Sequence, residues 1–86
     1  MDIDQLTKIV KKKIEDNLSP QFISIKDKTF LHEKHRAHTK GKFHIKILIK
    51  SKNIENMSKI EKTRLLYNVL KIEIKNYIHS IEIEFT

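Results

Sequence analysis

With 86 residues, 38% of them hydrophobic, the chain has the size of one small domain covering residues 1–86, because so short a chain cannot build two separate cores. It contains no cysteine, which excludes disulfides and thiolate metal sites built from this chain alone, so a metal would need histidine or carboxylate ligands or thiolates from a partner. The formal net charge of +7 favours nucleic acid or another anionic partner. No apolar run reaches the roughly 18 residues that span a bilayer. The N-terminal MDIDQLTKIV is unlike a targeting sequence, so we expect a soluble, cytoplasmic protein without membrane contact.

The first part of the chain predicts a helix followed by a strand. Asp2 or Asp4 can cap the helix, and the apolar side chains that recur at the spacing of one helical face are Leu6, Ile9, Val10 and Ile14. Proline cannot continue a helix, so the helix should end at Ser19-Pro20. Residues 22–26, FISIK, then alternate apolar and polar side chains, as in a strand with one buried face.

The strongest strand pattern is HIKILIK, His44 to Lys50, in which three isoleucines share one face. His44 alternates with them, so we expect it to be an exposed polar residue on the sheet. A loop connects this strand to the preceding one. The stretch FLHEKHRAHTKGKFH, Phe30 to His44, contains four of the five histidines in the chain.

A second helix and a third strand complete the pattern. Ser58 can cap the helix, with Glu61 completing a capping box. The apolar stripe of this helix is about five turns long and consists of Ile60, Thr63, Leu66, Tyr67, Leu70 and Ile74. The strand IHSIEIEF, Ile78 to Phe85, places on one face His79, Ile81, Ile83 and Phe85.

The order α-β-β-α-β predicts an α+β fold of two layers, with both helices on one face of a three-stranded mixed sheet. This arrangement is economical because each strand has one apolar face and each helix has one apolar stripe. The first two strands should pair antiparallel. The helical crossover between the second and third strands is long enough for a parallel, right-handed connection.

Four segments add a more specific signal. They are IKDKTFLHEKH (Ile25 to His35), which leads to a loop histidine; FHIKILIKS (Phe43 to Ser51), similar to a histidine-aromatic-lysine strand followed by serine; KTRLLYNVL (Lys62 to Leu70), similar to an Arg-His-Arg helix motif; and IHSIEI (Ile78 to Ile83), similar to a Val-His-Ala-Leu segment. In this order and spacing they resemble the BolA-like protein family, along almost the whole chain from about Leu6 to Phe85.

The resemblance implies a type II KH-like fold and two described roles. One role is partnership with a monothiol glutaredoxin, in which the two proteins share a 2Fe-2S cluster and serve iron-sulfur cluster trafficking or iron homeostasis. The other is transcriptional regulation through DNA binding. Neither role is enzymatic, and we expect the chain alone to be a monomer or a weak homodimer.

The resemblance also implies which residues bind the metal cluster. In the BolA-like family the histidine that matches His79 is a cluster ligand, and a loop histidine is the second. Counting back nine residues from His44 favours His35 as the loop ligand, whereas counting forward from Asp27 favours His32. Imidazole can ligate a cluster, as it does in Rieske centres. A chain without cysteine can therefore hold half of a site whose thiolates come from a partner and from glutathione.

Two alternatives use other features of the chain. A zinc site made of the loop histidines His32, His35 and His38 alone is disfavoured, because three imidazoles on one loop lack the scaffold that tetrahedral zinc requires. For DNA binding, the exposed candidates are Arg64, Lys71 and Lys75 on one flank of the second helix. With a single glycine the chain cannot form the Gly-x-x-Gly loop with which KH-like domains hold a nucleic-acid backbone, so phosphate attraction would give salt-sensitive and largely nonspecific binding.

The sequence shows no set of residues that is typical of an enzyme active site. It contains no nucleophile with a matching base, no phosphate-binding glycine loop and no paired carboxylates in a predicted cleft. We therefore expect a protein that is not an enzyme.

Overall fold

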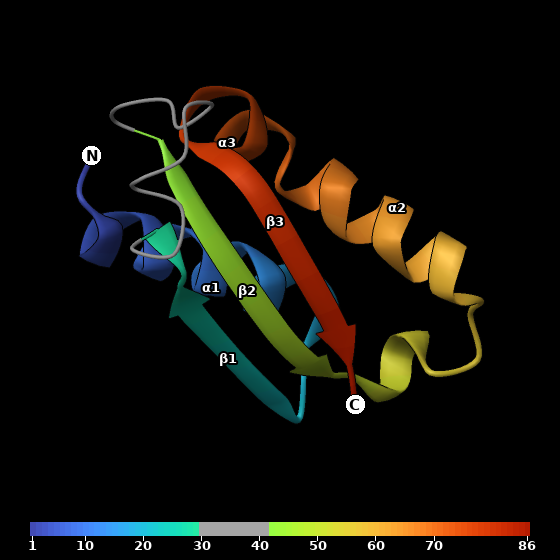
Figure 1. Ribbon diagram of the computed structural model, residues 1–86. Coiled ribbons are helices and arrows are strands. Elements are labelled where there is room, and N and C mark those ends of the chain that lie inside the picture. The colour runs from blue at the N-terminus through green and yellow to red at the C-terminus, as the bar shows by residue number, and fades with distance from the viewer. Residues whose placement is uncertain (30–41) are drawn as a thin grey trace.

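The structure, a computed structural model, describes residues 1–29 and 42–86 of the protein. Its elements follow the predicted order and are α1 (Ile3–Leu18), β1 (Phe22–Asp27), β2 (Phe43–Lys50), the short 3-10 helix η2 (Lys52–Ile54), α2 (Lys59–Val69), α3 (Lys71–Asn76) and β3 (Ile78–Phe85). Figure 1 shows α1 crossing one face of the sheet, with α2 and α3 beside β3. In the part of the chain that the structure describes, no helix has the length and apolar character needed to cross a membrane.

The sheet has the order β1-β2-β3, so β2 is the central strand. β1 pairs with β2 antiparallel, with Ile25 opposite Ile47, and β2 pairs with β3 parallel, with Ile47 opposite Ile83. The predicted mixed, three-stranded sheet is thereby confirmed. One consequence of this topology is that the end of β1 and the beginnings of β2 and β3 meet at the same end of the sheet.

One apolar core lies between the sheet and the helices. Its members are at most 4% exposed and are Leu6, Val10, Ile14, Leu18, Ile45, Ile47, Ile49, Ile54, Leu66, Leu70 and Ile78. They come from both long helices and from the same face of the sheet, which places α1 and α2 on one side of it. The predicted two-layer α+β architecture is therefore confirmed.

α1 begins and ends as its sequence predicts. Asp2 caps it, because its side chain accepts a hydrogen bond from the Gln5 backbone N–H at 2.8 Å while the Gln5 side chain accepts one from the Asp2 backbone at 3.1 Å. The helix ends at Ser19, whose left-handed φ of 43° turns the chain away before Pro20.

The second helix differs from the prediction in two ways. It is not one continuous helix, because Leu70, with φ −101° and ψ 16°, separates α2 from α3. Its buried face also agrees with the prediction only in part: Leu66 and Leu70 are fully buried as predicted, whereas Ile60 is 65% exposed and Tyr67 is 45% exposed.

The reason for the second difference is a competing apolar stripe on the same helix. Apart from Thr63, the half-buried or buried residues of α2 and its C-cap recur at i, i+3, i+4, i+7 and i+8 and are Lys62, Leu65, Leu66, Val69 and Leu70. Lys62 can belong to this stripe because its aliphatic stem packs while its charged end stays accessible. Its Nζ lies 5.3 Å from the centre of the Phe85 ring.

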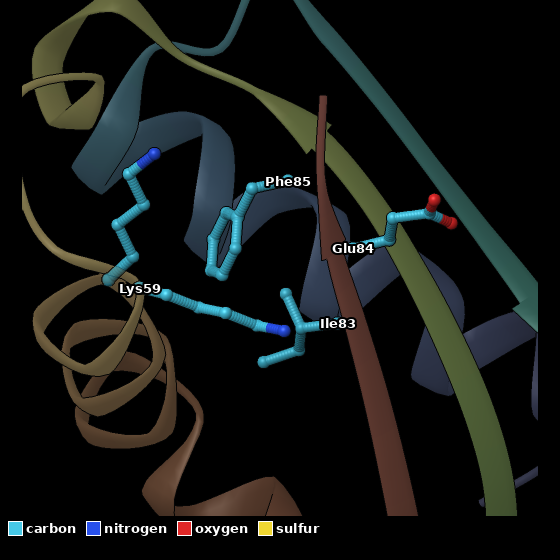
Figure 2. A pocket seen from close by; sticks show the side chains of 5 residues that line it. Lys59, Ile83, Glu84 and Phe85 are labelled. Atoms are coloured by element: carbon cyan, nitrogen blue, oxygen red, sulfur yellow. The ribbon is translucent and has the colours of Figure 1, made fainter.

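α2 packs against the end of β3, where successive side chains of the strand point to opposite faces of the sheet. In Figure 2 the side chains of Ile83 and Phe85 point toward the helix, whereas Glu84 points to the opposite side of the strand. Lys59 of α2 lines the same surface, and the hollow between α2 and the end of β3 has a volume of about 310 Å³. On the opposite face of the sheet, Lys46 Nζ lies 3.3 Å from a Glu84 carboxylate oxygen.

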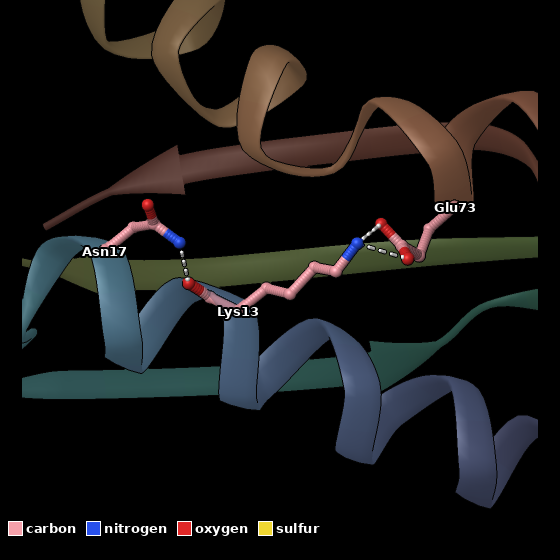
Figure 3. Close-up of polar contacts among 3 residues, drawn as sticks. All are labelled: Lys13, Asn17 and Glu73. Carbon is pink, nitrogen blue, oxygen red and sulfur yellow. Dashed lines mark hydrogen bonds and ion pairs between the residues drawn. The ribbon is translucent and has the colours of Figure 1, made fainter.

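An ion pair joins α1 to α3. Lys13 Nζ donates to both carboxylate oxygens of Glu73, at 2.9 and 2.7 Å, as Figure 3 shows. The Glu73 side chain is only 6% exposed, whereas that of Lys13 is 34% exposed. Because a buried carboxylate without a counter-charge is costly, Lys13 makes the burial of Glu73 possible.

We expect Lys13→Met to lower the free energy of unfolding by about 1–3 kcal/mol, since it leaves the Glu73 carboxylate buried without its counter-ion while the partial exposure of the pair limits the loss. Urea denaturation followed by circular dichroism measures this change. Lys12→Met is the matched control: Lys12 lies one residue away with a side chain 78% exposed, so it should change stability by less than about 0.5 kcal/mol. Equal effects of the two substitutions would contradict a structural role for the Lys13–Glu73 pair.

Candidate functional site

The candidate site lies at the end of the sheet where β1 ends and β2 and β3 begin. His44 is the second residue of β2, and the residues that follow β1 are bonded to its backbone. The Lys28 N–H donates to the His44 carbonyl at 2.7 Å, and the His44 N–H donates to Thr29 Oγ1 at 3.2 Å. Thr29 is in turn held by Asp27, whose Oδ1 accepts from the Thr29 N–H at 2.9 Å. The last described residues before position 30 are therefore fixed beside His44.

A bulge at the start of β3 determines where His79 lies. Phe43 is paired with Ile78, but the next residue of β2, His44, is paired with Ser80, so His79 is an extra residue in β3. Ile78, at 3% exposed, belongs to the core, and the inward alternation resumes at Ile81. The prediction that His79 shares the face of Ile81 was therefore wrong: the bulge moves His79 out of the apolar row and leaves it exposed.

The bulge also brings two histidines together. The ring centroids of His44 and His79 are 4.9 Å apart, with an interplanar angle of 60°. His44 Nδ1 forms a hydrogen bond of 2.5 Å with Ser80 Oγ, the hydroxyl that the bulge places opposite it. His44 is only 4% exposed, so its predicted exposure was wrong. Two contacts hold its ring in place at the sheet surface, the ring of His79 and the hydroxyl of Ser80.

His44 is the site residue that the sequence reasoning undervalued. The available signal was its position at the beginning of the strongest strand, next to a parallel strand that also begins with a histidine. Strand alternation alone assigns such a residue to a solvated face. The pairing of His44 with Ser80 depends on the bulge, and no local pattern in the sequence predicts that bulge.

The other metal-ligand candidates fall outside the described residues. His35 and His32 both lie between positions 30 and 41, so their distance to His79 stays untested. Within residues 1–29 and 42–86, no three side chains of the kinds that bind metals converge on one point. What the described residues provide here is an exposed imidazole, His79, backed by the buried imidazole of His44.

The candidate DNA-binding residues lie on the helices that connect β2 to β3. Arg64, Lys71 and Lys75 are all exposed. The break at Leu70 places Arg64 on α2 and the two lysines on α3. The C-terminal end of α3 reaches the histidine end of the sheet, since Lys42 Nζ donates to the Lys75 carbonyl at 3.5 Å. The setting of His79 is thus basic as well as accessible.

Comparisons with known proteins agree with this architecture. The family model described as BolA-like protein matches residues 14–86. A relative named DNA-binding transcriptional regulator BolA, from Haemophilus influenzae, is 26% identical over 76 residues, which cover 88% of this chain and 71% of the relative. Among solved structures, BolA1 from Arabidopsis thaliana is similar with a TM-score of 0.79 and 25% identity, covering 93% of this chain and 88% of that one.

A second solved structure supports the same assignment. The BolA domain of SufE1 from Arabidopsis thaliana has a TM-score of 0.78 and 25% identity, with coverage of 92% of this chain and 87% of that one. The family match covers more than half of the chain and includes both β2, with His44, and β3, with His79. The chain therefore belongs to the BolA-like family.

Proposed function

We propose that this protein is an adaptor that docks a monothiol glutaredoxin and supplies His79, together with His35 or His32, to a 2Fe-2S cluster shared by the two proteins. Its role would lie in iron-sulfur cluster trafficking or iron homeostasis. The observation that carries the proposal is the bulge that exposes His79 at the end of the sheet, beside the described ends of the segment whose sequence contains His35 and His32.

The donor set suits such a cluster. A 2Fe-2S cluster accepts imidazole in place of thiolate, and a chain without cysteine has no thiolate of its own to offer. Two imidazoles from this chain would leave two positions for thiolates of the partner and of glutathione. Ligands that bind metals are usually oriented by neighbouring groups, and here the His79 ring lies against His44, which is itself held by Ser80.

Joint purification with a monothiol glutaredoxin tests this function. We expect a heterodimer that, in the presence of iron, sulfide and glutathione under reducing conditions, shows visible absorption and circular dichroism that differ from those of the glutaredoxin alone. A mixture that elutes as two separate proteins, and whose spectrum equals that of the glutaredoxin alone, would count against the proposal.

DNA-binding transcriptional regulation is the second candidate function. It is favoured by the names of relatives such as the Haemophilus influenzae protein, and by the exposure of Arg64, Lys71 and Lys75. It predicts sequence-selective binding to duplex DNA that persists at about 0.15 M salt and that weakens when these three residues are neutralised. Fluorescence anisotropy with labelled duplexes distinguishes this outcome from salt-labile binding that is the same for every sequence.

A further inference from the structure

A small hollow with apolar walls lies on the exposed side of α2, away from the core. Ile60, Thr63 and Tyr67 line it at i, i+3 and i+7, and Lys59 and Arg64 flank them. Its volume is about 310 Å³, enough to receive one large side chain of another molecule. We call these five residues the α2 hollow.

The fold does not need the apolar side chains of the α2 hollow. Leu66 and Leu70 already fill the core side of this helical segment and are fully buried, whereas Ile60 is 65% exposed and Tyr67 is 45% exposed. Single exposed apolar residues are ordinary, but two large ones that line one concavity at helical spacing are typical of a contact surface.

The charged side chains that line the α2 hollow are both positive. Of the two acids of α2 and α3, Glu61 accepts a hydrogen bond from the capping Ser58 and Glu73 is paired with Lys13, and neither forms an ion pair with Lys59 or Arg64. Within the described ranges, Lys59 and Arg64 take part in none of the ion pairs. The surface therefore combines an apolar centre with a cationic rim.

We propose that the α2 hollow binds an acidic segment of a partner protein, which inserts one large apolar side chain between Ile60 and Tyr67 while its carboxylates face Lys59 and Arg64. Charge complementarity selects an acidic partner over a second copy of this chain, which also carries a net charge of +7. A protein segment fits better than duplex DNA, because the outside of a duplex offers phosphates but no apolar side chain to fill the hollow.

The α2 hollow and the histidine site are separate surfaces. Lys59 lines the α2 hollow and also the hollow beside Phe85, which places this surface at the C-terminal end of β3. His79 lies at the beginning of the same strand. The two proposals can therefore fail independently.

Titration of the full chain with synthetic peptides tests the inference. The probe is an acidic peptide of about 14 residues with one central leucine; the controls are the same peptide with serine for leucine, and with amides for its carboxylates. Using amide signals of the 15N-labelled protein, we expect the probe to shift signals of Ile60, Thr63 and Tyr67. Each control peptide should bind about tenfold more weakly, since it lacks one of the two complementary features.

Variants of the chain provide matched controls. Ile60→Ser should weaken binding of the probe about tenfold, whereas Ile72→Ser should not, although Ile72 is 59% exposed on the neighbouring helix. Arg64→Glu should weaken it, whereas Lys11→Glu on α1 changes the net charge equally and should have a much smaller effect.

Three results would overturn the inference. The first is equal binding of the leucine and serine peptides, which would mean that the surface attracts acidic peptides by charge alone and binds no apolar side chain. The second is a duplex DNA probe that shifts the same amide signals and competes with the peptide at about 0.15 M salt. The third is concentration-dependent dimerisation of the free chain that Ile60→Ser abolishes, because a second copy would then be the occupant.

Discussion

Replacing His79 by alanine is expected to abolish the cluster spectrum of the heterodimer with a monothiol glutaredoxin, because the substitution removes the one candidate ligand that the structure describes. Since the His79 side chain is exposed, the free energy of unfolding of the isolated chain should change by less than about 0.5 kcal/mol. Visible circular dichroism of the reconstituted pair and urea denaturation of the free chain measure the two effects. An unchanged cluster spectrum would remove His79 from the ligand set.

The loop histidines complete this experiment. We expect that either His35→Ala or His32→Ala abolishes the cluster spectrum, as His79→Ala does, and that the other variant leaves the spectrum intact. His38→Ala is the control for removing an imidazole from the same segment. If all three variants keep the spectrum, the second ligand comes from elsewhere.

His44 distinguishes positioning from ligation. Because His44 is 4% exposed and its ring is bonded to Ser80, His44→Ala should destabilise the free chain by about 1–3 kcal/mol through the lost packing and hydrogen bond. The heterodimer should still form a cluster, with an altered circular dichroism spectrum, since the ring against which His79 lies is gone. Complete loss of the cluster, as in His79→Ala, would make His44 a ligand and not a positioning residue.

Leu66→Ala is expected to lower the free energy of unfolding by about 2–5 kcal/mol, more than any substitution at an exposed position of α2. Leu66 is fully buried, so truncation removes apolar contacts and leaves a cavity. For a small domain whose total stability is about 5–15 kcal/mol, this approaches unfolding. Thermal and urea denaturation followed by circular dichroism measure it.

Ile60→Ala is the matched control on the same helix. The sequence pattern assigned Ile60 to the buried stripe together with Leu66, whereas the structure leaves Ile60 65% exposed. Its truncation should therefore cost less than about 0.5 kcal/mol. If the two variants lose comparable free energy of unfolding, Ile60 is buried as the sequence pattern predicted. The exposure on which the α2 hollow rests would then be contradicted.

Features that depend on neighbouring residues were predictable. Asp2 caps α1 as expected, and Ser58 accepts from the Glu61 N–H at the start of α2, because each cap involves residues three positions apart. The strand alternation around Ile47 likewise identified the buried face of the sheet. The resemblance of four segments to the BolA-like family is confirmed by the family match over residues 14–86.

Features that depend on packing across the sheet were not predictable from local patterns. α2 has two overlapping apolar stripes that share Leu66, and the one that includes Leu65 and Val69 is buried because that side of the helix meets α1 and β3, which the helix sequence cannot specify. The break at Leu70 is equally invisible, since leucine is a good helix former.

By itself, the sequence determined the αββαβ order, the helix caps and the presence of a histidine at the start of the third strand, since each of these follows from residues close together in the chain. Only the tertiary structure decided where that histidine points. The parallel pairing of β2 with β3 skips His79, so that Ser80 lies opposite His44 and the His79 ring turns from the core toward solvent. The physical reason is that a bulge belongs to a pair of strands: it is set by the register between two strands that lie far apart in the chain, which each strand's own alternation leaves open.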